Sequence, residues 1–360
     1  MTAQKEQGSL RRVNASVDEV ARSLVGRFQT NRGVRRMLVL VVVAFALFAA
    51  LRPGVYLSTL NLQNIAVAAP EIGVLAIAQM LAMLTGGIDL SIVAVANLTA
   101  ITISTLYTAA GSRGDALGPV FILIGLVVAL VGGLVNGLLV SRVGITPILA
   151  TLATMQIFNG LAVVWTGGRT LYGAPRVLTG VGNATVGGIP VLFIALLLVA
   201  AGIGILINRT ALGHKIQLQG ANPTAAAYSG ISSRRTLLGT YVMTGLLGGI
   251  AGMLFIARNP TASADYGASY TLLVIVIAVL GGTNPNGGFA TVTGVVLAAL
   301  TLQIVSSGFN AMRWSPYQYA VAQGLILIVV MVSDQVHLRR RRRGTPPALP
   351  VGPATPPTPV

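Results

Sequence analysis

The sequence predicts an all-α polytopic membrane protein of about ten transmembrane helices, with broken or re-entrant segments at glycine-rich motifs and a weak internal repeat. The first supporting observation is composition, because the 360 residues are 54% hydrophobic and only 9% charged. A soluble domain carries about 25% charged residues, whereas a surface that faces lipid needs none. The other two observations are a series of long apolar runs and the placement of the basic residues.

The distribution of the net charge of +16 predicts that the chain associates with a lipid bilayer and does not bind nucleic acid. Eight of the 24 basic residues precede residue 37, and five more form the run Arg339–Arg343. These groups flank a hydrophobic body, which is typical of membrane proteins with positively charged cytosolic segments. The chain has no cysteine, which excludes disulfides, thiolate nucleophiles and cysteine-ligated metals.

Three segments follow from this pattern. Residues 1–36 form a basic cytosolic arm, either partly an amphipathic surface helix or a disordered tail, and too long for the leading region of an ordinary signal peptide. Residues 37–335 form the transmembrane domain, which includes a cytosolic loop at 208–236. Residues 336–360 form a basic and then proline-rich cytosolic tail, whose composition cannot build a core.

The apolar runs predict the individual helices. A crossing needs about 20 apolar residues. Candidate crossings lie at 37–51, 64–84, 90–108, 119–141, 147–166, 189–207, 236–257, 270–282, 290–309 and 316–333. The run at 270–282 is short and ends in two glycines, which is typical of a broken helix that ends inside the membrane.

The basic residues also predict the orientation. With the N-terminus in the cytosol, the inside segments hold 18 basic residues and the outside loops hold six. This asymmetry favours two cytosolic termini and an even number of crossings, and eight or twelve crossings also fit.

One inside loop, 208–236, is the longest polar stretch within the body and predicts a short surface helix. Asn222 and Pro223 suit a helix start, and Gly230 suits a helix stop. The alternative is a plain connecting loop, but long loops without structure are uncommon and are usually functional. The residues assigned to docking of a partner are Asn222, Pro223, Ala226, Ser229, Gly230, Arg234 and Arg235.

Two glycine-rich stretches, 83–100 and 279–300, echo each other. Each has a glycine pair after an apolar run, and the offset between Gly86 and Gly281 is 195 residues. Transporters are often built from two such repeats, and the letters leave open whether the repeat is parallel or inverted. The predicted helix breaks are Gly86, Gly87, Asp89, Gly281, Gly282, Gly287 and Gly288.

Two carboxylates border or enter apolar segments. Asp89 precedes an apolar run, so it is either the N-cap of the next helix or a proton relay or sugar ligand, with the cap favoured. Glu71 follows Pro70 near the outer face, and we expect it to be structurally paired.

Uncharged polar residues on the predicted spans complete the candidate site. Any one of them is expected to bond between helices, but as a set they suggest a polar, uncharged path. The predicted path residues are Gln79, Asp89, Asn97, Asn136, Thr154, Asn159 and Asn284. No catalytic set, metal-ligand spacing or nucleotide-binding P-loop is visible, so the chain is not expected to be an enzyme or to bind a metal or cofactor itself.

Four blocks resemble the ribose, xylose, arabinose and galactoside permeases, which are membrane subunits of bacterial sugar ABC importers. They are "TGGIDLS" at 85–91, the stretch 136–168, "NRTALGHKIQLQGANPTAAAYSGI" at 208–231 and "GGTNPNGG" at 281–288. The resemblance implies a multi-pass inner-membrane permease that imports a monosaccharide. It also implies an extracytoplasmic sugar-binding protein, a second permease subunit, and a separate cytosolic ABC ATPase that binds ATP and docks on 208–236.

The sequence also departs from that family. Thr271 and Leu273 stand where acidic residues are usual, which leaves room for an autoinducer-2-type permease or for a half that does not contact substrate. A different class, an ion-coupled secondary transporter using Asp89, remains an alternative reading of the residues.

Overall fold

The computed structural model describes residues 32–315, 317–319, 321–325 and 328. Two compact units divide the chain, residues 1–315 and 316–360, and the account below concerns the first. The predicted arm at 1–36 and the tail at 336–360 fall largely or wholly outside the described residues, and so does half of the predicted tenth crossing at 316–333.

Eight helices in the described part of the chain are long and apolar enough to cross a membrane. They are α2 (Arg32–Leu51), α4 (Thr59–Leu84), α5 (Ile92–Ala110), α6 (Gly118–Leu138), α7 (Pro147–Thr166), α9 (Val191–Arg209), α12 (Ser233–Arg258) and α14 (Val292–Ala311). Each corresponds to a predicted crossing, so the all-α polytopic class is confirmed.

The predicted crossing at 270–282 is instead the 11-residue helix α13 (Tyr270–Leu280). At 1.5 Å per residue it spans about 16 Å, roughly half of a hydrocarbon core of about 30 Å. The non-helical segment 259–269 precedes it, and a glycine-rich segment follows it. It is therefore a half-length helix, as expected for a broken segment.

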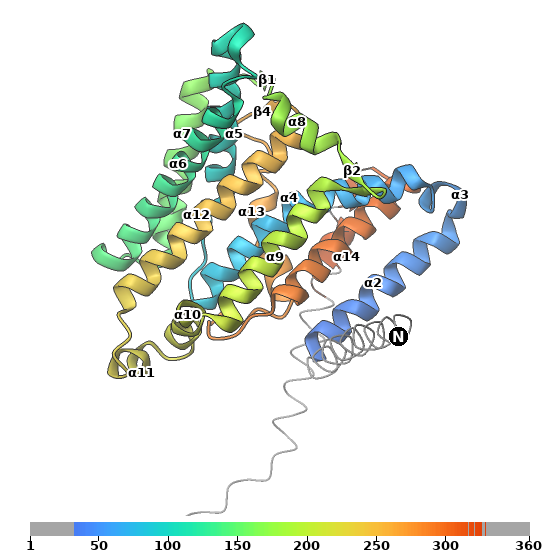
Figure 1. Cartoon of the computed structure of the whole chain (residues 1–360). Coiled ribbons are helices and arrows are strands. Elements are labelled where there is room, and N and C mark those ends of the chain that lie inside the picture. Colours follow the sequence, from blue (N-terminus) through green and yellow to red (C-terminus); the bar gives the residue numbers. More distant parts are fainter. Residues whose placement is uncertain (1–31, 316, 320, 326–327, 329–360) are drawn as a thin grey trace, which may run out of the picture. The chain divides into compact units, whose positions relative to one another are not determined.

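Short elements connect these helices at both ends of the unit (Figure 1). The helical ones are α3 (Pro53–Tyr56), η1 (Gly111–Arg113), the π-helical turn η2 (Leu139–Val143), α8 (Arg176–Asn183), α10 (Ala211–Ala221) and α11 (Pro223–Tyr228). Two antiparallel strand pairs join β1 (Leu171–Tyr172) to β4 (Thr261–Ala262) and β2 (Thr185–Val186) to β3 (Ile189–Pro190). The strand pairs and α8 lie at the end opposite α10 and α11 (Figure 1).

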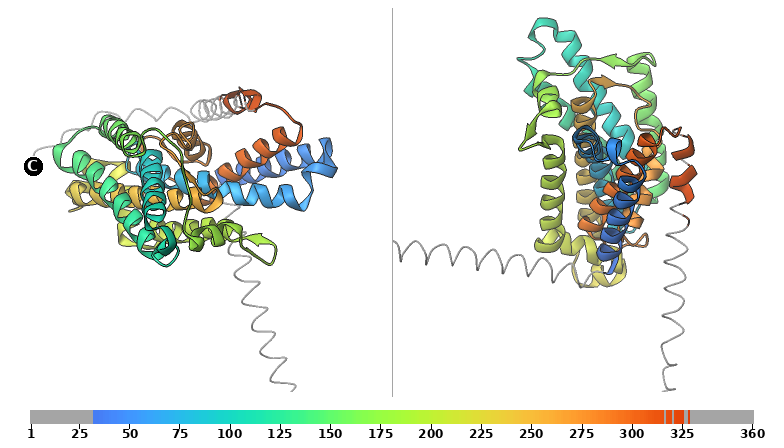
Figure 2. Two further views of the ribbon diagram at one scale, coloured as in Figure 1. Left: turned by 90° about the horizontal axis from the view of Figure 1, so that it is seen from above. Right: turned by 90° about the vertical axis from the view of Figure 1, so that its right-hand side faces the viewer.

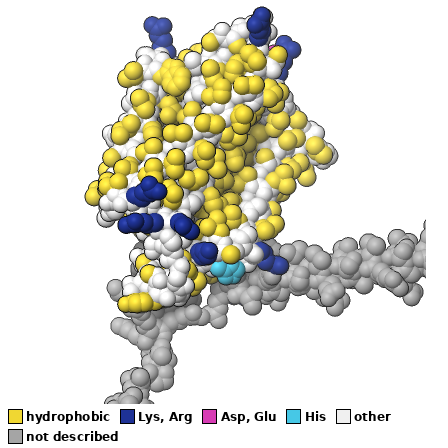
Figure 3. Space-filling view, turned by 60° about the vertical axis from the view of Figure 1, so that its left-hand side comes forward, with side chains coloured by type: hydrophobic (Ala, Val, Ile, Leu, Met, Phe, Trp, Pro, Cys, Tyr) yellow, Lys and Arg dark blue, Asp and Glu magenta, His cyan; other side chains and the backbone are white. Residues whose placement is uncertain are grey.

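The long helices divide into central and peripheral ones. Most of the apolar length of α4, α5, α12 and α14 is buried, whereas α2, α6, α7 and α9 expose most of theirs. Figures 1 and 2 place α2 beside α14, while α6 and α7 pack on the opposite side around α5 and α12. The peripheral helices expose large apolar side chains such as Leu198 (67%) and Leu123 (61%). These surfaces suit lipid, and Figure 3 shows a wide hydrophobic band with lysine and arginine side chains towards its two ends.

Glycine permits a close contact between α6 and α12. Gly133 of α6 faces Gly245 of α12, and a side chain on either would collide with the backbone of the opposing helix. Helices associate in lipid mainly through such close packing, because no hydrophobic effect drives them together there. This contact fixes peripheral α6 against central α12, which carries one of the side chains of the candidate site.

Candidate functional site

The first predicted break is the segment 85–91 between α4 and α5. Gly86 has a φ of 81°, a conformation that residues with a side chain rarely adopt. The amides of Gly86 and Gly87 donate to the carbonyls of Met83 (2.9 Å) and Ala82 (3.2 Å), which closes the end of α4. The break is thus built by the backbone of its two glycines.

Asp89 is the centre of a buried polar network at this break. Its Oδ1 accepts from the N–H (3.0 Å) and hydroxyl (2.7 Å) of Ser91, and its Oδ2 accepts from the hydroxyl of Thr244 in α12 (2.8 Å). Asn136 of α6 donates to the Ser91 hydroxyl at 2.6 Å and accepts from Thr154 of α7 at 2.6 Å. The network joins the break to α6, α7 and α12 through donors within this chain.

The prediction that Asp89 is the N-cap of the next helix is wrong by two residues. α5 begins at Ile92 with Ser91 at the cap position, and no side chain caps it. The physical reason is tertiary, since Thr151 of α7 accepts the N–H of Leu90 at 3.1 Å and holds an additional turn ahead of the helix. Asp89 stabilises that turn.

The second break follows α13 and has the same geometry. Gly282 has a φ of 92°, and the amides of Gly282 and Thr283 donate to the carbonyls of Val279 (2.9 Å) and Ala278 (3.0 Å). The pattern matches that of Gly86 and Gly87 at the end of α4. Gly86 therefore corresponds to Gly282 in the second repeat. The sequence comparison had aligned Gly86 with Gly281, one residue earlier.

The two breaks and the end of α10 meet at one point. The N–H of Gly288 donates to the carbonyl of Leu84 at 3.0 Å. A side chain on Gly220 of α10 would collide with both of those backbone groups, and one on Gly287 would collide with Gly220. α4 and α13 run in the same direction, because Glu71 in the middle of α4 contacts Tyr266 just before α13, while the end of α4 contacts the segment after α13. The two halves of the repeat are therefore parallel.

The loop 208–236 contains two helices, α10 and α11. Asn222 caps α11 by accepting the N–H of Ala225 at 3.0 Å, Pro223 occupies its first turn, and Gly230 follows it with a φ of 78°. Tyr228 is 90% exposed and lines a shallow hollow with Pro223, Thr224 and Ala227. α11 thus presents an apolar face to its surroundings.

Two exposed arginines begin the next helix, α12. Arg234 and Arg235 lie in its first turn, where the helix dipole disfavours positive charge. Ala226 is buried, and the Ser229 hydroxyl donates to the Ala225 carbonyl at 3.0 Å. Neither residue offers Arg234 or Arg235 a negative charge. The positive charges of these arginines therefore do not favour the start of α12.

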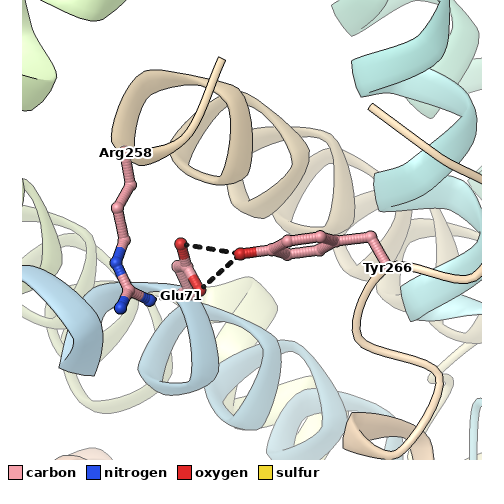
Figure 4. A network of polar contacts seen from close by, with 3 residues as sticks. All are labelled: Glu71, Arg258 and Tyr266. Carbon is pink, nitrogen blue, oxygen red and sulfur yellow. Dashed lines mark hydrogen bonds and ion pairs between the residues drawn. The ribbon is translucent and has the colours of Figure 1, made fainter. Parts of the chain in front are cut away.

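A second polar network is centred on Glu71, midway along α4 (Figure 4). The fully buried carboxylate of Glu71 accepts from the guanidinium of Arg258 at 3.0 Å, and from the hydroxyl of Tyr266 at 3.3 and 3.4 Å. The expectation that Glu71 is structurally paired is confirmed. The Tyr266 hydroxyl is the donor in both of its contacts with Glu71.

The structure separates the predicted path residues into three kinds. Asp89, Asn136 and Thr154 belong to the first network, and Asn284 bonds within its own turn, to Gly287 and Asn286. Asn159 is half-buried on peripheral α7.

The two remaining path residues retain free polar atoms. Gln79 of α4 is fully buried, and neither its amide nitrogen nor its amide oxygen has a partner. Asn97 of α5 donates to the carbonyls of Ala264 (2.8 Å) and Tyr266 (2.9 Å), but its Oδ1 has no partner. Gln79 lies five residues before the end of α4 and Asn97 five residues after the start of α5, so both lie about 7.5 Å along their helices from the break.

Three functional features escaped sequence reasoning. Thr244 and Ser91 are common residues whose role depends on helices that meet only in three dimensions. Gly220 carries no local signal, because its close approach to the breaks is purely tertiary. Arg258 had one usable signal in the sequence, because it is a charged residue at the end of a long apolar run and could pair with the buried carboxylate of Glu71.

Comparison with known proteins adds independent findings. A family model described as the permease component of the branched-chain amino acid transport system matches residues 61–331. The autoinducer 2 import system permease protein LsrD of Salmonella typhimurium is 34% identical over 278 residues, which cover 75% of this chain and 82% of the relative. LsrD of Escherichia coli is 31% identical over 313 residues, covering 84% and 92%. No solved structure matches.

The eight apolar helices of the described residues define a multi-pass membrane protein. The family match spans well over half of the chain, and the chain therefore belongs to this permease-component family. The resemblance to sugar-type ABC importer permeases is confirmed at this level, and the chain is a non-enzymatic subunit of the inner membrane.

Proposed function

We propose that this chain is the permease subunit of an ABC importer for a small, uncharged, hydroxylated solute. Autoinducer-2 is the first candidate because the LsrD relatives are named for its import. A monosaccharide of the ribose, xylose, arabinose or galactose class is the second. One observation carries the proposal: among the described side chains that are themselves buried, those with unpaired polar atoms, such as Gln79 and Asn97, carry uncharged amide or hydroxyl groups.

The buried charges support this solute class. Glu71 is paired with Arg258, and Asp89 accepts three hydrogen bonds from Ser91 and Thr244. An amino acid would bring a carboxylate and an ammonium group into the membrane, and each would need a charged or strongly polar partner. The amides of Gln79 and Asn97 instead suit hydroxyl groups, to which an amide both donates and accepts.

The remaining subunits follow from the same proposal. A separate cytosolic ATPase binds ATP and docks on α10 and α11, where Arg234 and Arg235 meet acidic groups. An extracytoplasmic binding protein delivers the solute at the opposite end, and a second permease subunit, identical or different, completes the transporter. Both chain termini lie in the cytosol. The junction of Gly220 with both breaks gives the ATPase a direct mechanical connection to the interior.

Uptake by cells that express the complete transporter tests the solute class, with matched cells that lack this chain as the control. Autoinducer-2, ribose, xylose, arabinose, galactose and leucine are supplied separately. We expect chain-dependent uptake of one hydroxylated solute and none of leucine. Uptake of leucine alone would reject the proposed class.

The energy source distinguishes an ABC importer from the alternative of an ion-coupled carrier. We expect uptake to stop when ATP is depleted while the proton gradient is clamped. Uptake by the purified chain alone in liposomes, driven by an ion gradient, would overturn the proposal. The three hydrogen bonds that Asp89 accepts within the chain favour the ABC importer, because they give Asp89 a structural role that needs no proton relay.

A further inference from the structure

The segment 259–269, which we call the strap, links α12 to α13 without forming a helix. Its first part pairs with β1 through Thr261 and Ala262. Its middle is held by Asn97 of α5, which donates to the carbonyls of Ala264 and Tyr266 at 2.8 and 2.9 Å. Ala262 and Ala264 are buried, whereas Asp265, Ala268 and Ser269 are exposed, so the strap packs one side against the unit and leaves the other open.

The strap enters the depth of the membrane. It leaves α12 at the end opposite α11 and leads to α13, which spans only about 16 Å before it reaches the junction of the two breaks. Non-helical backbone at such depth occurs only where it is buried in protein or lines a water-filled path. The strap therefore occupies the space among α4, α5 and α12 on the side away from the ATPase loop.

A buried charge holds the strap in this position. The carboxylate of Glu71 is fully buried and contacts both Arg258, the last residue of α12 just before the strap, and Tyr266 within the strap. Tyr266 also stacks against Phe255 of α12, with ring centroids 4.7 Å apart. The side chain of Arg258 is 36% exposed, so this partner reaches towards water.

Such a pair suits a reversible contact. A buried ion pair adds little net stability, because the desolvation of its charges offsets most of the attraction between them. If the strap moved away and admitted water, Glu71 would exchange the Tyr266 hydroxyl for hydration. Asn97 holds the strap only through its N–H groups, and its Oδ1 stays free for a solute that passes.

We propose that the strap is the gate at the end opposite α11, and that Glu71 is the latch that keeps it closed through Arg258 and Tyr266. This inference rests on the proposed function as a permease. It assigns Glu71 and Tyr266 a positioning role on the strap and no direct contact with solute.

The natural absence of cysteine makes the test direct. Ala264→Cys places a single thiol on the closed strap, where Ala264 is 9% exposed. Its labelling rate with a membrane-impermeant maleimide is measured on the full chain in lipid nanodiscs. We expect Glu71→Gln to speed labelling by about tenfold, because loss of the charge weakens the latch and favours local opening. Ala227→Cys on exposed α11 should label at one rate in both backgrounds.

Tyr266→Phe is the second variant, because it removes only the hydroxyl contact. We expect an intermediate rise in labelling, and this variant decides the question if Glu71→Gln fails to fold. Slow labelling in the folded variants, equal to that of the parent, would overturn the latch. Fast labelling of the parent itself would overturn the closed strap. Uptake by the unaltered transporter is measured separately, so failure of the permease function is distinguishable from failure of the gate.

Discussion

At the scale of single residues, the structure assigns different roles to polar side chains that look alike in the sequence. Asp89 and Gln79 both stand in apolar surroundings as polar exceptions. Asp89 is fully hydrogen-bonded within the chain, while both polar atoms of Gln79 are unpaired. A buried polar group that is hydrogen-bonded within the chain has a structural role. A buried polar group without a hydrogen-bond partner is instead available to bind a solute.

Asp89→Ala should destabilise the protein by about 1–3 kcal/mol, because it leaves the buried N–H and hydroxyl of Ser91 without their acceptor. Asp89→Asn should cost less, since its amide oxygen still accepts from Ser91 and the Thr244 hydroxyl can turn to the Tyr241 carbonyl. Thermal unfolding in detergent measures both. Asp89→Asn should retain uptake, and its abolition in a protein of normal stability would restore the relay reading.

Gln79→Leu should raise stability by roughly 1 kcal/mol, because it removes a buried amide that lacks partners, and it should lower uptake about tenfold or more. A purely structural glutamine predicts the opposite pattern, with stability lost. Asn159→Leu on peripheral α7 is the matched control and should leave uptake unchanged. Thermal unfolding and initial uptake rates on the same preparations decide between the two readings.

At this scale the sequence predicted which polar residues are important, but it did not predict the contacts that they make. Amide and carboxylate side chains within apolar runs are evident in the amino-acid sequence, and Asp89 and Gln79 were both predicted to be site residues. Their bonding was not visible, because Thr151, Thr244 and Asn136 reach the first break from three other helices. The register of the cap at Asp89 was wrong for the same reason.

At the scale of elements, the junction of α10 with the two breaks is the feature that joins surface to interior. Three backbone segments approach so closely that Gly220 has no room for a side chain. A displacement of α10 therefore moves both breaks together. Local signals sufficed for α11, where Asn222, Pro223 and Gly230 mark its start and stop, but nothing local marks Gly220.

Gly220→Ala should reduce both stability and uptake, because the new methyl group forces Leu84 and Gly288 apart. Gly239→Ala is the matched control, since that position in α12 has open space. There the change should stabilise the helix by about 0.5–1 kcal/mol. Equal behaviour of the two variants in thermal unfolding and uptake would remove the junction from the mechanism.

Arg234→Glu combined with Arg235→Glu should uncouple ATP hydrolysis from uptake while the protein reaches the membrane at its usual level. The reason is that both side chains are exposed in the first turn of α12, where they are available to acidic groups of the ATPase. Arg169→Glu, exposed near the opposite end, is the control. Coupled uptake in the double variant would count against docking at this surface.

At the scale of the whole molecule, composition and apolar runs predicted the helices well, because the demand of lipid for satisfied backbone leaves few alternatives. They did not show which helices are central, since α4 and α9 are both apolar along their length while only α4 is largely buried. The parallel sense of the repeat also needed the structure, through the contact of Leu84 with Gly288.

Membrane orientation is testable with single thiols in the cysteine-free chain. Tyr228→Cys on α11 should react with an impermeant maleimide only in inside-out vesicles. Val186→Cys on β2, whose side chain is 63% exposed at the opposite end, should react only in right-side-out vesicles. The reverse pattern would place the loop 208–236 outside the cell and reject it as an ATPase surface.

The bond between Leu84 and Gly288 also sets an order for biosynthesis. A ribosome adds about 5–20 residues per second, so roughly 10–40 s separate the synthesis of these two positions. During that interval α4 is already in the bilayer, while the carbonyl of Leu84 still lacks the partner that the finished chain provides. The first half of the repeat therefore waits in an incomplete state, and the arrival of the second glycine-rich segment is the step that closes the nascent subunit.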